Sequence, residues 1–541
     1  MKYELFKSLI IRLVQEAVKD EFNYEIATVE VEIPNNVENG NFSTNIALKL
    51  TKELGKAPRE IASSIMANVS KEEKFKKVEI AGPGFLNFYV ADEYYLELIK
   101  QINRDIGELT IKIDVPVNYN VEFVSANPTG DLHLGHARGA AYGDALARFL
   151  ARQGNNVVTE YYINDAGKQM DNLGLSVKYF YELFCGLDSE FPKDGYGGSE
   201  IKAIASDIFK EFNDLKLNED MQWFREIAYS KNFIEIKRIL KLLNIEYQVW
   251  SSERSYFENN KVEKNLEQLK ASGDLFEEEG ATWLNTEKYG DDKNRVLRKN
   301  DGSLTYFATD IAYHIDKYNR GDVLIDIWGG DHHGYMKRVK CAMESLGHSQ
   351  ESIEILFIQM INIVRNDEVV KMSKRAGTAV TIKELLKEID VEAMRYFFVM
   401  RSPDTQVDFD LDVASKQSSE NPVFYIQYAH ARISSLIDKA QAENIVIKEN
   451  VENLNEMELA LMSLVAAYSG EVYEAAAKRL PHILCNYLYE LATKYHQYYN
   501  ACPVFTNNHD EISDKINLCN CIKIVIADGL GLLGVQAKNK M

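Results

Sequence analysis

The sequence has no uninterrupted apolar run near the roughly 18 residues that a membrane-spanning helix requires. Its first twenty residues place Leu5, Leu9 and Leu13 at helical spacing, but Arg12 and Glu16 interrupt the apolar stretch that a signal peptide needs. We therefore interpret this segment as an amphipathic surface helix. The sequence predicts no membrane partner and a cytoplasmic location.

Cysteine is scarce: the chain has six, and they are scattered rather than paired. This pattern fits neither a disulfide framework nor the two Cys pairs of a common zinc site. Cys519 and Cys521 could suggest a metal clip, but they lie in an apolar stretch that is typical of a helix. We expect the cysteines to be reduced and buried, and we expect no structural zinc or other metal site.

Basic residues are outnumbered, since 62 Lys and Arg against 82 Asp and Glu give a formal net charge of −20. Proteins that coat nucleic acid depend on Lys and Arg at the phosphates, so this composition argues against such a protein and against a DNA partner. It does not exclude RNA. Residues 421–541 carry 10 basic and 13 acidic residues, a net −3, so most of the negative charge lies elsewhere.

Proline is also scarce, with ten in 541 residues, and the chain has no internal repeat or low-complexity tract. Changes of pattern divide it into three predicted parts: 1–112, 113–415 and 416–541. The first part has a helical pattern at 57–69 and a strand pair at 77–90 that is broken at Gly82-Pro83-Gly84. It is predicted to be a small α+β domain.

The middle part alternates strand and helix patterns, which is typical of βαβ units and a parallel sheet. We expect a helix at 134–152 and strands at 119–123, 157–163, 323–328 and 353–363. The polar stretch at about 180–300 is too long for a simple crossover, so we interpret it as an insertion.

After about residue 415 only helical patterns continue. They predict helices at 423–440, 459–473, 483–499 and 516–533. The predicted fold class is α/β: a Rossmann-like parallel-sheet domain with an N-terminal α+β domain and a C-terminal all-α helical bundle.

A histidine pair marks the start of the helix predicted at 134–152. His133-Leu134-Gly135-His136 lies where a strand and a loop give way to a helix, whose N-terminus offers free N–H groups and partial positive charge to a phosphate. Gly135 lets a flat ring approach the backbone, and both histidines can donate to phosphoryl oxygens. A His-x-x-His pair alone also fits a solvent-facing pair or half of a metal site.

A basic loop follows some 235 residues later, where Lys371-Met372-Ser373-Lys374-Arg375 lies between a strand and a helix. Two lysines with small residues between them can close over a triphosphate and offset charge as pyrophosphate leaves. An ordinary solvated basic loop is the alternative for such a short run.

The two motifs in this order resemble the paired signatures of class I aminoacyl-tRNA synthetases, and further segments narrow the resemblance to arginyl-tRNA synthetases. In the middle part these are Glu122 to Gly130, Tyr162 to Gly167, Leu304 to Tyr313 and Trp328 to Gly334. Ala81 to Phe88 near the N-terminus and Tyr428 to Arg432 at the start of the bundle extend it over essentially the whole chain.

The resemblance implies an arginine–tRNA ligase. Arginine and ATP, with Mg²⁺, would give arginyl-adenylate and pyrophosphate, and arginine would then pass to the 2′-OH of the 3′-terminal ribose of tRNA(Arg). The N-terminal domain would contact the outer corner of the tRNA and the bundle would bind its anticodon loop. Family members commonly need bound tRNA for the first step and are usually monomers.

The resemblance also implies the residues of the site. The implied catalytic residues are His133, His136, Lys371 and Lys374. ATP binding falls to the same four residues and to Gly135, Gly329, Gly330, Asp331 and Ser373. Arginine binding falls to Glu122, Asn127, His133, Tyr306, Asp310 and His333. Binding of tRNA falls to Phe85, Asn87, Tyr425, Tyr428, Tyr498 and Tyr499.

These residue types fit their implied ligands. A guanidinium is always charged and presents a planar fork of donors, so its pocket needs carboxylate oxygens rather than apolar walls. Asp310, one helical turn from Tyr306, has a carboxylate that suits the guanidinium end of arginine. The alternative is that Asp310 forms an ordinary exposed salt bridge. Asp331 suits ribose hydroxyls, while His332 and His333 could instead be metal ligands. The tyrosines could stack on bases or be packing residues.

Three other functions compete with this interpretation. A different class I synthetase would share the phosphate motifs but not the carboxylate-bearing run from Tyr306 to Asp310. A nucleotidyltransferase with a His-x-x-His signature would be shorter and lack the tyrosine-rich bundle. An inactive, synthetase-like RNA-binding regulator would have no chemical reason to keep His133, His136, Lys371 and Lys374 together.

Overall fold

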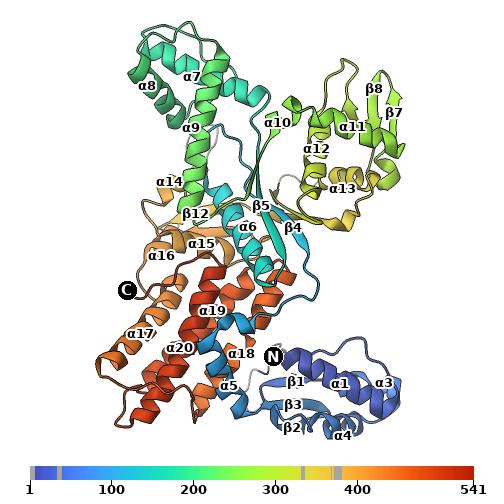
Figure 1. The fold of residues 1–541 in the computed structure, drawn as a ribbon, viewed down its shortest axis with the longest axis vertical. Helices are drawn as coiled ribbons and strands as arrows, with labels where there is room; N and C mark the ends of the chain where they lie inside the picture. The colour runs from blue at the N-terminus through green and yellow to red at the C-terminus, as the bar shows by residue number, and fades with distance from the viewer. Residues whose placement is uncertain (1–5, 33, 35–38, 331–334, 367, 371–379) are drawn as a thin grey trace.

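The computed structural model covers most of the chain, with a few internal gaps. The described residues are 6–32, 34, 39–330, 335–366, 368–370 and 380–541. The predicted site residues Asp331, His333, Lys371, Ser373 and Lys374 lie outside these ranges. Figure 1 shows a central sheet with two lobes above it, a helical bundle below it and a separate N-terminal unit beside the bundle.

Five parallel strands form the central sheet in the order β11-β10-β4-β5-β6. They are β4 (Asn118–Glu122), β5 (Asn156–Ile163), β6 (Val249–Ser252), β10 (Val323–Gly329) and β11 (Ile353–Ile358). The first strand of this sheet in chain order, β4, lies between β5 and β10, so the direction of winding reverses there. The crevice outside the carboxyl ends of the strands at such a reversal is where open parallel sheets bind ligands.

The structure confirms three of the four predicted strands, which match β4, β5 and β10 within one residue at each end. The fourth prediction is wrong, because 353–363 comprises β11 and the start of β12 (Ile361–Arg365), which belongs to another sheet. The chain leaves the central sheet at Gln359, whose N–H donates to the Pro403 carbonyl at 2.9 Å. No sequence pattern predicts β6, a four-residue strand in a polar stretch.

The polar stretch at 180–300 is two excursions rather than one insertion, because β6 pairs with β5 between them. The first forms a lobe of α7 (Lys168–Phe184), α8 (Ser199–Phe212) and α9 (Met221–Leu242). The second forms a lobe of α10 (Glu253–Glu258), α11 (Lys261–Ser272), an antiparallel sheet of β7 (Leu275–Glu278), β8 (Ala281–Leu284) and β9 (Arg295–Arg298), α12 (Tyr306–Tyr318) and α13 (Met336–Ser345). Each lobe has its own hydrophobic core.

Helix α6 (Leu134–Arg152) follows β4 and has the predicted bounds. It packs tightly on the sheet, because a Cβ on Gly143 would lie 2.2 Å from Phe123 Cγ. A second sheet, β13-β12-β14, links the central sheet to the bundle. Its elements and the neighbouring helices are β13 (Glu368–Val369), β14 (Val407–Asp410), α14 (Ile382–Leu385), α15 (Val391–Val399) and α16 (Leu411–Ser415).

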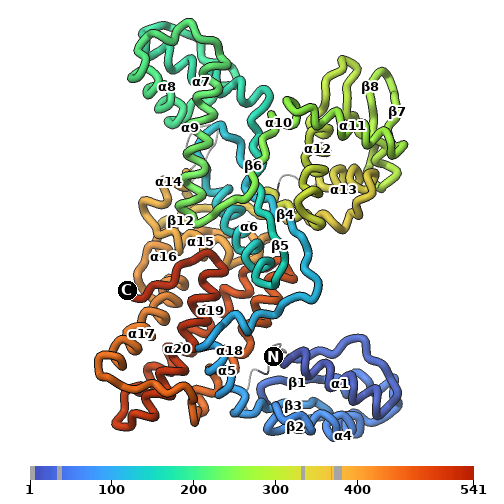
Figure 2. Tube along the Cα trace, in the orientation of Figure 1, coloured from blue at the N-terminus to red at the C-terminus, as the bar shows by residue number. Residues whose placement is uncertain are grey.

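The N-terminal unit is the predicted α+β domain, a β1-β3-β2 antiparallel sheet covered by helices. It contains α1 (Phe6–Phe22), β1 (Phe42–Thr44), α2 (Ile46–Lys49), α3 (Thr51–Leu54), α4 (Pro58–Val69), β2 (Phe75–Ala81) and β3 (Phe85–Val90). Helix α5 (Asp92–Arg104) then packs against α18 and α20 of the bundle. The tube in Figure 2 shows this unit beside the bundle, connected through α5.

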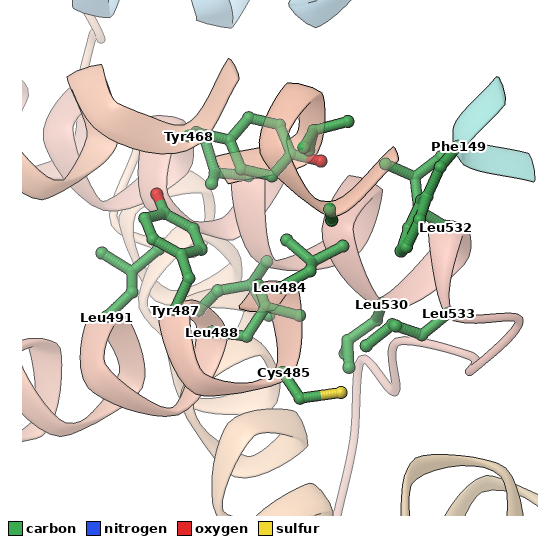
Figure 3. Close-up of a cluster of buried hydrophobic side chains, with 14 of the residues drawn as sticks. Phe149, Tyr468, Leu484, Cys485, Tyr487, Leu488, Leu491, Leu530, Leu532 and Leu533 are labelled. Carbon is green, nitrogen blue, oxygen red and sulfur yellow. The ribbon is translucent and has the colours of Figure 1, made fainter. Parts of the chain in front are cut away.

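The C-terminal bundle consists of α17 (Pro422–Ala442), α18 (Glu456–Ala477), α19 (His482–Ala501) and α20 (His509–Leu532), which contain the four predicted helices to within one residue. Figure 3 shows its core, where Leu484 and Leu488 face Leu530 and where Phe149 of α6 lies against Leu532. Four of the six free cysteines are buried, as expected, whereas Cys185 and Cys502 are partly exposed. No helix in the described part of the chain is long and apolar enough to span a membrane.

Candidate active site

A cavity of about 270 Å³ lies at the carboxyl ends of β10 and β11, against the N-terminus of α6. Its walls include Val124, His133, Gly135, His136, Trp328, Gly329 and Gln359. The predicted phosphate motif and the predicted nucleotide glycine Gly329 therefore meet at one cavity. The sheet places this cavity at its point of reversal, where a parallel sheet is expected to bind a ligand.

The two histidines are held by the helix start itself. His133 is the N-cap of α6, and its Nδ1 accepts from the Gly135 N–H at 3.2 Å, while His136 Nδ1 accepts from the His133 N–H at 3.2 Å. The two rings lie 3.7 Å apart between centroids. Since each Nδ1 is an acceptor, each neutral ring carries its proton on Nε2. Both rings can therefore donate from Nε2, next to the positive end of the helix dipole.

The glycines at the cavity leave room for a ligand. A Cβ on Gly329 would have no described atom within 4 Å, so a side chain there would occupy open space beside the cavity. On Gly330 it would make ordinary contacts with the Gln359 amide, the shortest at 3.5 Å. On Gly135 it would lie 3.2 Å from His133 Cε1 and crowd the N-cap ring. The predicted ribose ligand Asp331 follows these glycines but is outside the described residues.

One described flank of the second motif, at Val380 and Ile382, lies beside the same helix start. The Leu134 N–H donates to the Val380 carbonyl at 3.2 Å, and the Ile382 N–H donates to the Leu132 carbonyl at 2.9 Å. On the other side, the Val370 N–H donates to the Ile363 carbonyl at 2.8 Å. Val380, the first described residue after the second motif, therefore lies directly beside the histidine motif, whereas the lysines of the second motif are outside the described residues.

The predicted guanidinium pocket lies on α12. Tyr306 and Asp310 are one turn apart; Tyr306 is 75% exposed and Asp310 is half-buried. Asp310 Oδ1 lies 3.3 Å from His314 Nδ1, whereas Oδ2 is buried and has no hydrogen-bond partner among the described residues. An unpaired buried carboxylate oxygen is costly, so this atom is well suited to receive a cationic ligand.

A second carboxylate at this pocket, that of Glu253, was not predicted from the sequence. Glu253, the first residue of α10, is 4% exposed, and its Oε2 has no hydrogen-bond partner among the described residues. Burial, followed by the nearby Asp165 and Asp310 carboxylates, raises the pKa of Glu253 to about 7. Glu253 follows β6, so only recognition of that short strand would have placed it at the carboxyl edge of the sheet.

Glu122 and Asn127 are near the pocket but are already bonded within the protein. Glu122 Oε2 accepts from Lys317 Nζ at 2.7 Å and from the Tyr313 hydroxyl at 2.8 Å, and its Oε1 accepts from the Ser125 hydroxyl at 2.7 Å. These bonds use three of the roughly four acceptor sites of a carboxylate. Asn127 Nδ2 donates to Gln169 Oε1 at 2.6 Å, so its amide oxygen is the group left for a substrate amine.

The bundle carries an aromatic and cationic cluster on α17 and α19, which we define as Tyr425, Tyr428, Arg432, His496 and Tyr499. The Arg432 guanidinium lies 4.6 Å from the Tyr428 ring centroid and 4.3 Å from that of Tyr499. Its Nη2 donates to the Tyr428 hydroxyl at 3.1 Å, and its Nη1 lies 3.1 Å from His496 Nδ1. Exposed rings beside a guanidinium can stack on unpaired bases. The four-residue spacing of Tyr428 and Arg432 on a predicted helix was the available signal for Arg432.

Two predicted tRNA residues do not face solvent. Tyr498 is fully buried and donates to Glu458 Oε1 at 2.8 Å, because it lies on the inner face of α19. Asn87 is 3% exposed on β3, the middle strand of its sheet, and accepts from the Ser43 hydroxyl at 2.8 Å. In this structure neither side chain is presented to solvent, so an RNA contact by either one stays a prediction. Phe85 is partly exposed.

Comparison with known proteins identifies the class. Residues 111–408 match the family model of the tRNA synthetases class I (R) catalytic domain, and residues 426–541 match that of the DALR anticodon binding domain. With the parallel sheet and the histidine-capped helix at its reversal point, these matches define a class I aminoacyl-tRNA synthetase. Residues 7–90 match the arginyl tRNA synthetase N terminal domain. The chain belongs to the arginyl-tRNA synthetase family.

Individual relatives match this chain over most of its length. An arginine–tRNA ligase of Bacillus cereus is 45% identical over 99% of each chain, and that of Bacillus subtilis is 43% identical over 96% of this chain and 95% of its own. Among solved structures, a putative arginyl-tRNA synthetase from Campylobacter jejuni is 34% identical, with a TM-score of 0.77 over 84% of this chain and 100% of its own. The Thermus thermophilus arginyl-tRNA synthetase shares the fold, with a TM-score of 0.78 and 22% identity over 99% of this chain and 100% of its own.

Proposed function

We propose how this chain, an arginine–tRNA ligase, divides its reaction among its residues. The nucleotide cavity at His133 and His136 would take ATP, and the pocket at Asp310 would take the arginine guanidinium. The arginine carboxylate would attack the α-phosphate in line to give arginyl-adenylate and pyrophosphate. The 2′-OH of the tRNA 3′-terminal ribose would then attack the activated carbonyl and release AMP.

One observation carries the assignment of the arginine pocket: Asp310 Oδ2 is buried and has no hydrogen-bond partner within the described part of the chain. A guanidinium offers parallel N–H donors to a carboxylate and remains charged at any physiological pH. Glu253 supplies a second unpaired carboxylate oxygen, so both could receive donors from one fork. Tyr306, on the exposed side of Asp310, would cover the guanidinium, and the amide oxygen of Asn127 would accept from the substrate amine.

The histidines would act electrostatically rather than covalently. Their Nε2–H groups would donate to phosphoryl oxygens as negative charge develops on them, and Lys371 and Lys374 would approach from the segment that ends beside Leu134. Losing one such preorganised donor commonly lowers the rate by about 10² to 10³. Mg²⁺ would arrive with ATP, since Mg²⁺ is usually held by substrate phosphates rather than by an all-protein cage.

The aromatic and cationic cluster of the bundle would bind the anticodon loop, and the partly exposed Phe85 at the start of β3 would contact the outer corner of the tRNA. We assign the three domains as 1–112, 113–415 and 416–541, with these roles for the first and last. We also propose that the enzyme is a monomer, works in the cytoplasm, and requires bound tRNA for adenylate formation.

Arginine-dependent exchange of pyrophosphate into ATP tests these assignments. With tRNA(Arg) present, exchange should depend on arginine among the standard amino acids, and Asp310→Asn should lower kcat/KM for arginine by about 10² or more while the KM for ATP changes little. Wild-type arginine kinetics in Asp310→Asn would overturn the pocket assignment. Full exchange without tRNA would overturn the proposed tRNA requirement and leave the pocket assignment intact.

A further inference from the structure

Helix α12 presents a polar stripe to the carboxyl ends of β4 and β10. Asp310, His314 and Lys317 are spaced at i, i+4 and i+7, so they lie on one face of the helix. Asp310 is at the end nearer the guanidinium pocket. Lys317 is at the other end, where it reaches Glu122 on β4 and Asp326 on β10. The stripe therefore connects the two ends of the proposed arginine site.

His314 is enclosed by oxygen atoms. It is 2% exposed; Nδ1 lies 2.8 Å from the Asp310 carbonyl oxygen and 3.3 Å from Asp310 Oδ1, and Nε2 lies 3.0 Å from Asp326 Oδ2. A neutral ring has one nitrogen with a lone pair, which would face an acceptor. Both nitrogens must therefore donate, which makes the ring an imidazolium. Burial alone would lower the pKa of His314, but Asp310 and Asp326 raise it to about 10.

The charges continue in alternation beyond His314. Asp326 is fully buried and accepts from His314 through Oδ2 and from the fully buried Lys317 through Oδ1. Lys317 also donates to Glu122 at 2.7 Å. The sequence of charges is Asp310, His314, Asp326, Lys317 and Glu122, beginning and ending with a carboxylate. Tyr313 donates to Glu122, and Tyr162, Tyr335 and Glu253 are the other titratable groups close to Asp310.

With all five groups charged, the row carries one net negative charge, and at its pocket end Asp310 Oδ2 has no hydrogen-bond partner among the residues that the structure describes. We propose that His314 is a positioning residue for arginine recognition: it holds Asp310 Oδ1 with its imidazolium so that Oδ2 stays directed at the guanidinium. Bound arginine then supplies the cation that completes the alternating row. This inference rests on the proposed function, in which Asp310 receives the guanidinium.

Loss of the His314 charge would leave the half-buried Asp310 beside the fully buried Asp326, and Lys317 would be the one cation of the row. Buried like charges cannot all remain ionised, so one carboxylate would take up a proton. Asp310 would also lose the donor that fixes its Oδ1, and with it the fixed orientation of its carboxylate. We expect arginine binding to weaken and ATP binding to be spared, because the proposed ATP cavity at His133 and Gly329 shares no residue with this row.

His314→Gln tests the inference, with His348→Gln as the matched control. His348 is stacked on Tyr318 at 3.7 Å, outside the row and the cavity. In aminoacylation with saturating tRNA, His314→Gln should raise the KM for arginine about 10-fold to 100-fold, the usual loss for a hydrogen bond to a charged group. The KM for ATP should change less than about 3-fold. His348→Gln should leave both constants unchanged.

Three results would overturn the positioning role: an unchanged KM for arginine, an equal rise in both KM values, or a loss confined to kcat. If His314→Gln and the smaller His314→Asn both fail to fold, ¹⁵N-histidine NMR of the wild-type enzyme decides. A buried imidazolium at pH 8 whose shift moves when arginine binds supports the role, and a neutral His314 ring at pH 8 overturns it. Failure of Asp310→Asn to impair arginine use would instead refute the underlying pocket assignment.

Discussion

Two carboxylate side chains of this enzyme are buried without full hydrogen bonding, which is unfavourable and which a cationic substrate would relieve. Asp310 and Glu253 each keep a buried carboxylate oxygen without a hydrogen-bond partner among the described residues. Neither could be recognised from its own surroundings in the sequence: Asp310 needed the family resemblance, and Glu253 depends on a strand that no pattern predicts. By contrast, the His133 and His136 interactions span three residues, so their geometry follows from the local helix start.

The raised pKa of Glu253 predicts how arginine binding depends on pH. Below about pH 7 the carboxyl is largely protonated, and above it the ionised form can accept from the guanidinium. The KM for arginine should therefore fall as pH rises from 6 to 8 in the wild-type enzyme. Glu253→Gln should have a higher KM that varies much less with pH. Steady-state kinetics across this range, with KM for ATP as the internal control, would check it.

The same residue predicts an opposite effect on stability without arginine. A carboxyl whose pKa is higher in the folded than in the unfolded state favours folding at low pH, and that contribution is lost as pH rises from about 4.5 to 7. Glu253→Gln should therefore melt at a higher temperature than the wild type at pH 8 and at a similar temperature at pH 5. A lower melting temperature at pH 8 would show that Glu253 is stabilised by a partner and is not an unpaired acid.

At the scale of elements, what could be predicted from the sequence depends on how local the signal is. The four helices of the bundle and α6 are 19 to 24 residues long and carry many buried apolar side chains, so their apolar pattern extends over several turns. The predicted range of α6 matches the observed one, and the predicted bundle helices lie within the observed ones to one residue, although α20 begins seven residues before its predicted start. β6 has only the residues Val249–Ser252, and its place is set by pairing with β5. The end of β11 is set by a contact with Pro403, about 45 residues away. Neither leaves a periodic pattern in the sequence.

Helix α6 combines a structural cap with a proposed phosphate site at His133, and substitution can separate the two. Asn is a favoured N-cap, so His133→Asn should retain the cap and the thermal stability of the enzyme. It should still lower kcat for pyrophosphate exchange by about 10² to 10³, because Asn does not place an N–H donor where His133 Nε2 lies.

His133→Ala is the comparison that distinguishes the two roles. It removes both the cap and the donor, so it should lose a similar factor in kcat and also about 1 kcal/mol of stability in urea unfolding. If His133→Asn kept wild-type exchange activity, His133 would be a cap only. If both variants were equally destabilised, the loss of activity could not be assigned to the phosphate contact.

At the scale of the whole molecule, α6 joins the proposed catalytic site to the bundle. Its N-terminus carries His133, while farther along Phe149 packs on Leu532 and Asp144 accepts from the buried Arg395. Arg395 also donates to the Leu533 carbonyl at 3.0 Å, beyond the end of α20. One hydrophobic core runs from the N-terminal unit through α6 to the bundle, whereas the two lobes over the sheet have separate cores. The N-terminal unit, α6 and the bundle therefore share one packed core, whereas the core of the second lobe includes Leu324 of β10 and Ile353 of β11.

This arrangement predicts that a change in the aromatic and cationic cluster of the bundle affects tRNA alone. Tyr499→Ala removes one of the two rings that hold Arg432, and stacking of a base on an aromatic ring is typically worth about 1 to 3 kcal/mol. The KM for tRNA should rise about 5-fold to 100-fold in aminoacylation, while the KM for ATP, measured at saturating tRNA, should not change. Tyr498→Phe, which removes only an inward-facing hydroxyl, should have wild-type tRNA kinetics and somewhat lower stability.

Tyr473→Ala is the matched surface control, since this tyrosine is 38% exposed on α18 and lies outside the cluster. Equal effects of Tyr499→Ala and Tyr473→Ala would mean that the bundle responds to any lost tyrosine and that the cluster has no special role. An increase in the KM for tRNA in both Tyr499→Ala and Arg432→Ala, but not in Tyr473→Ala, would place the RNA on the face shared by α17 and α19. Because that face and the cavity are joined through α6 and Arg395, a loss of ATP affinity in these variants would indicate disrupted packing rather than a lost RNA contact.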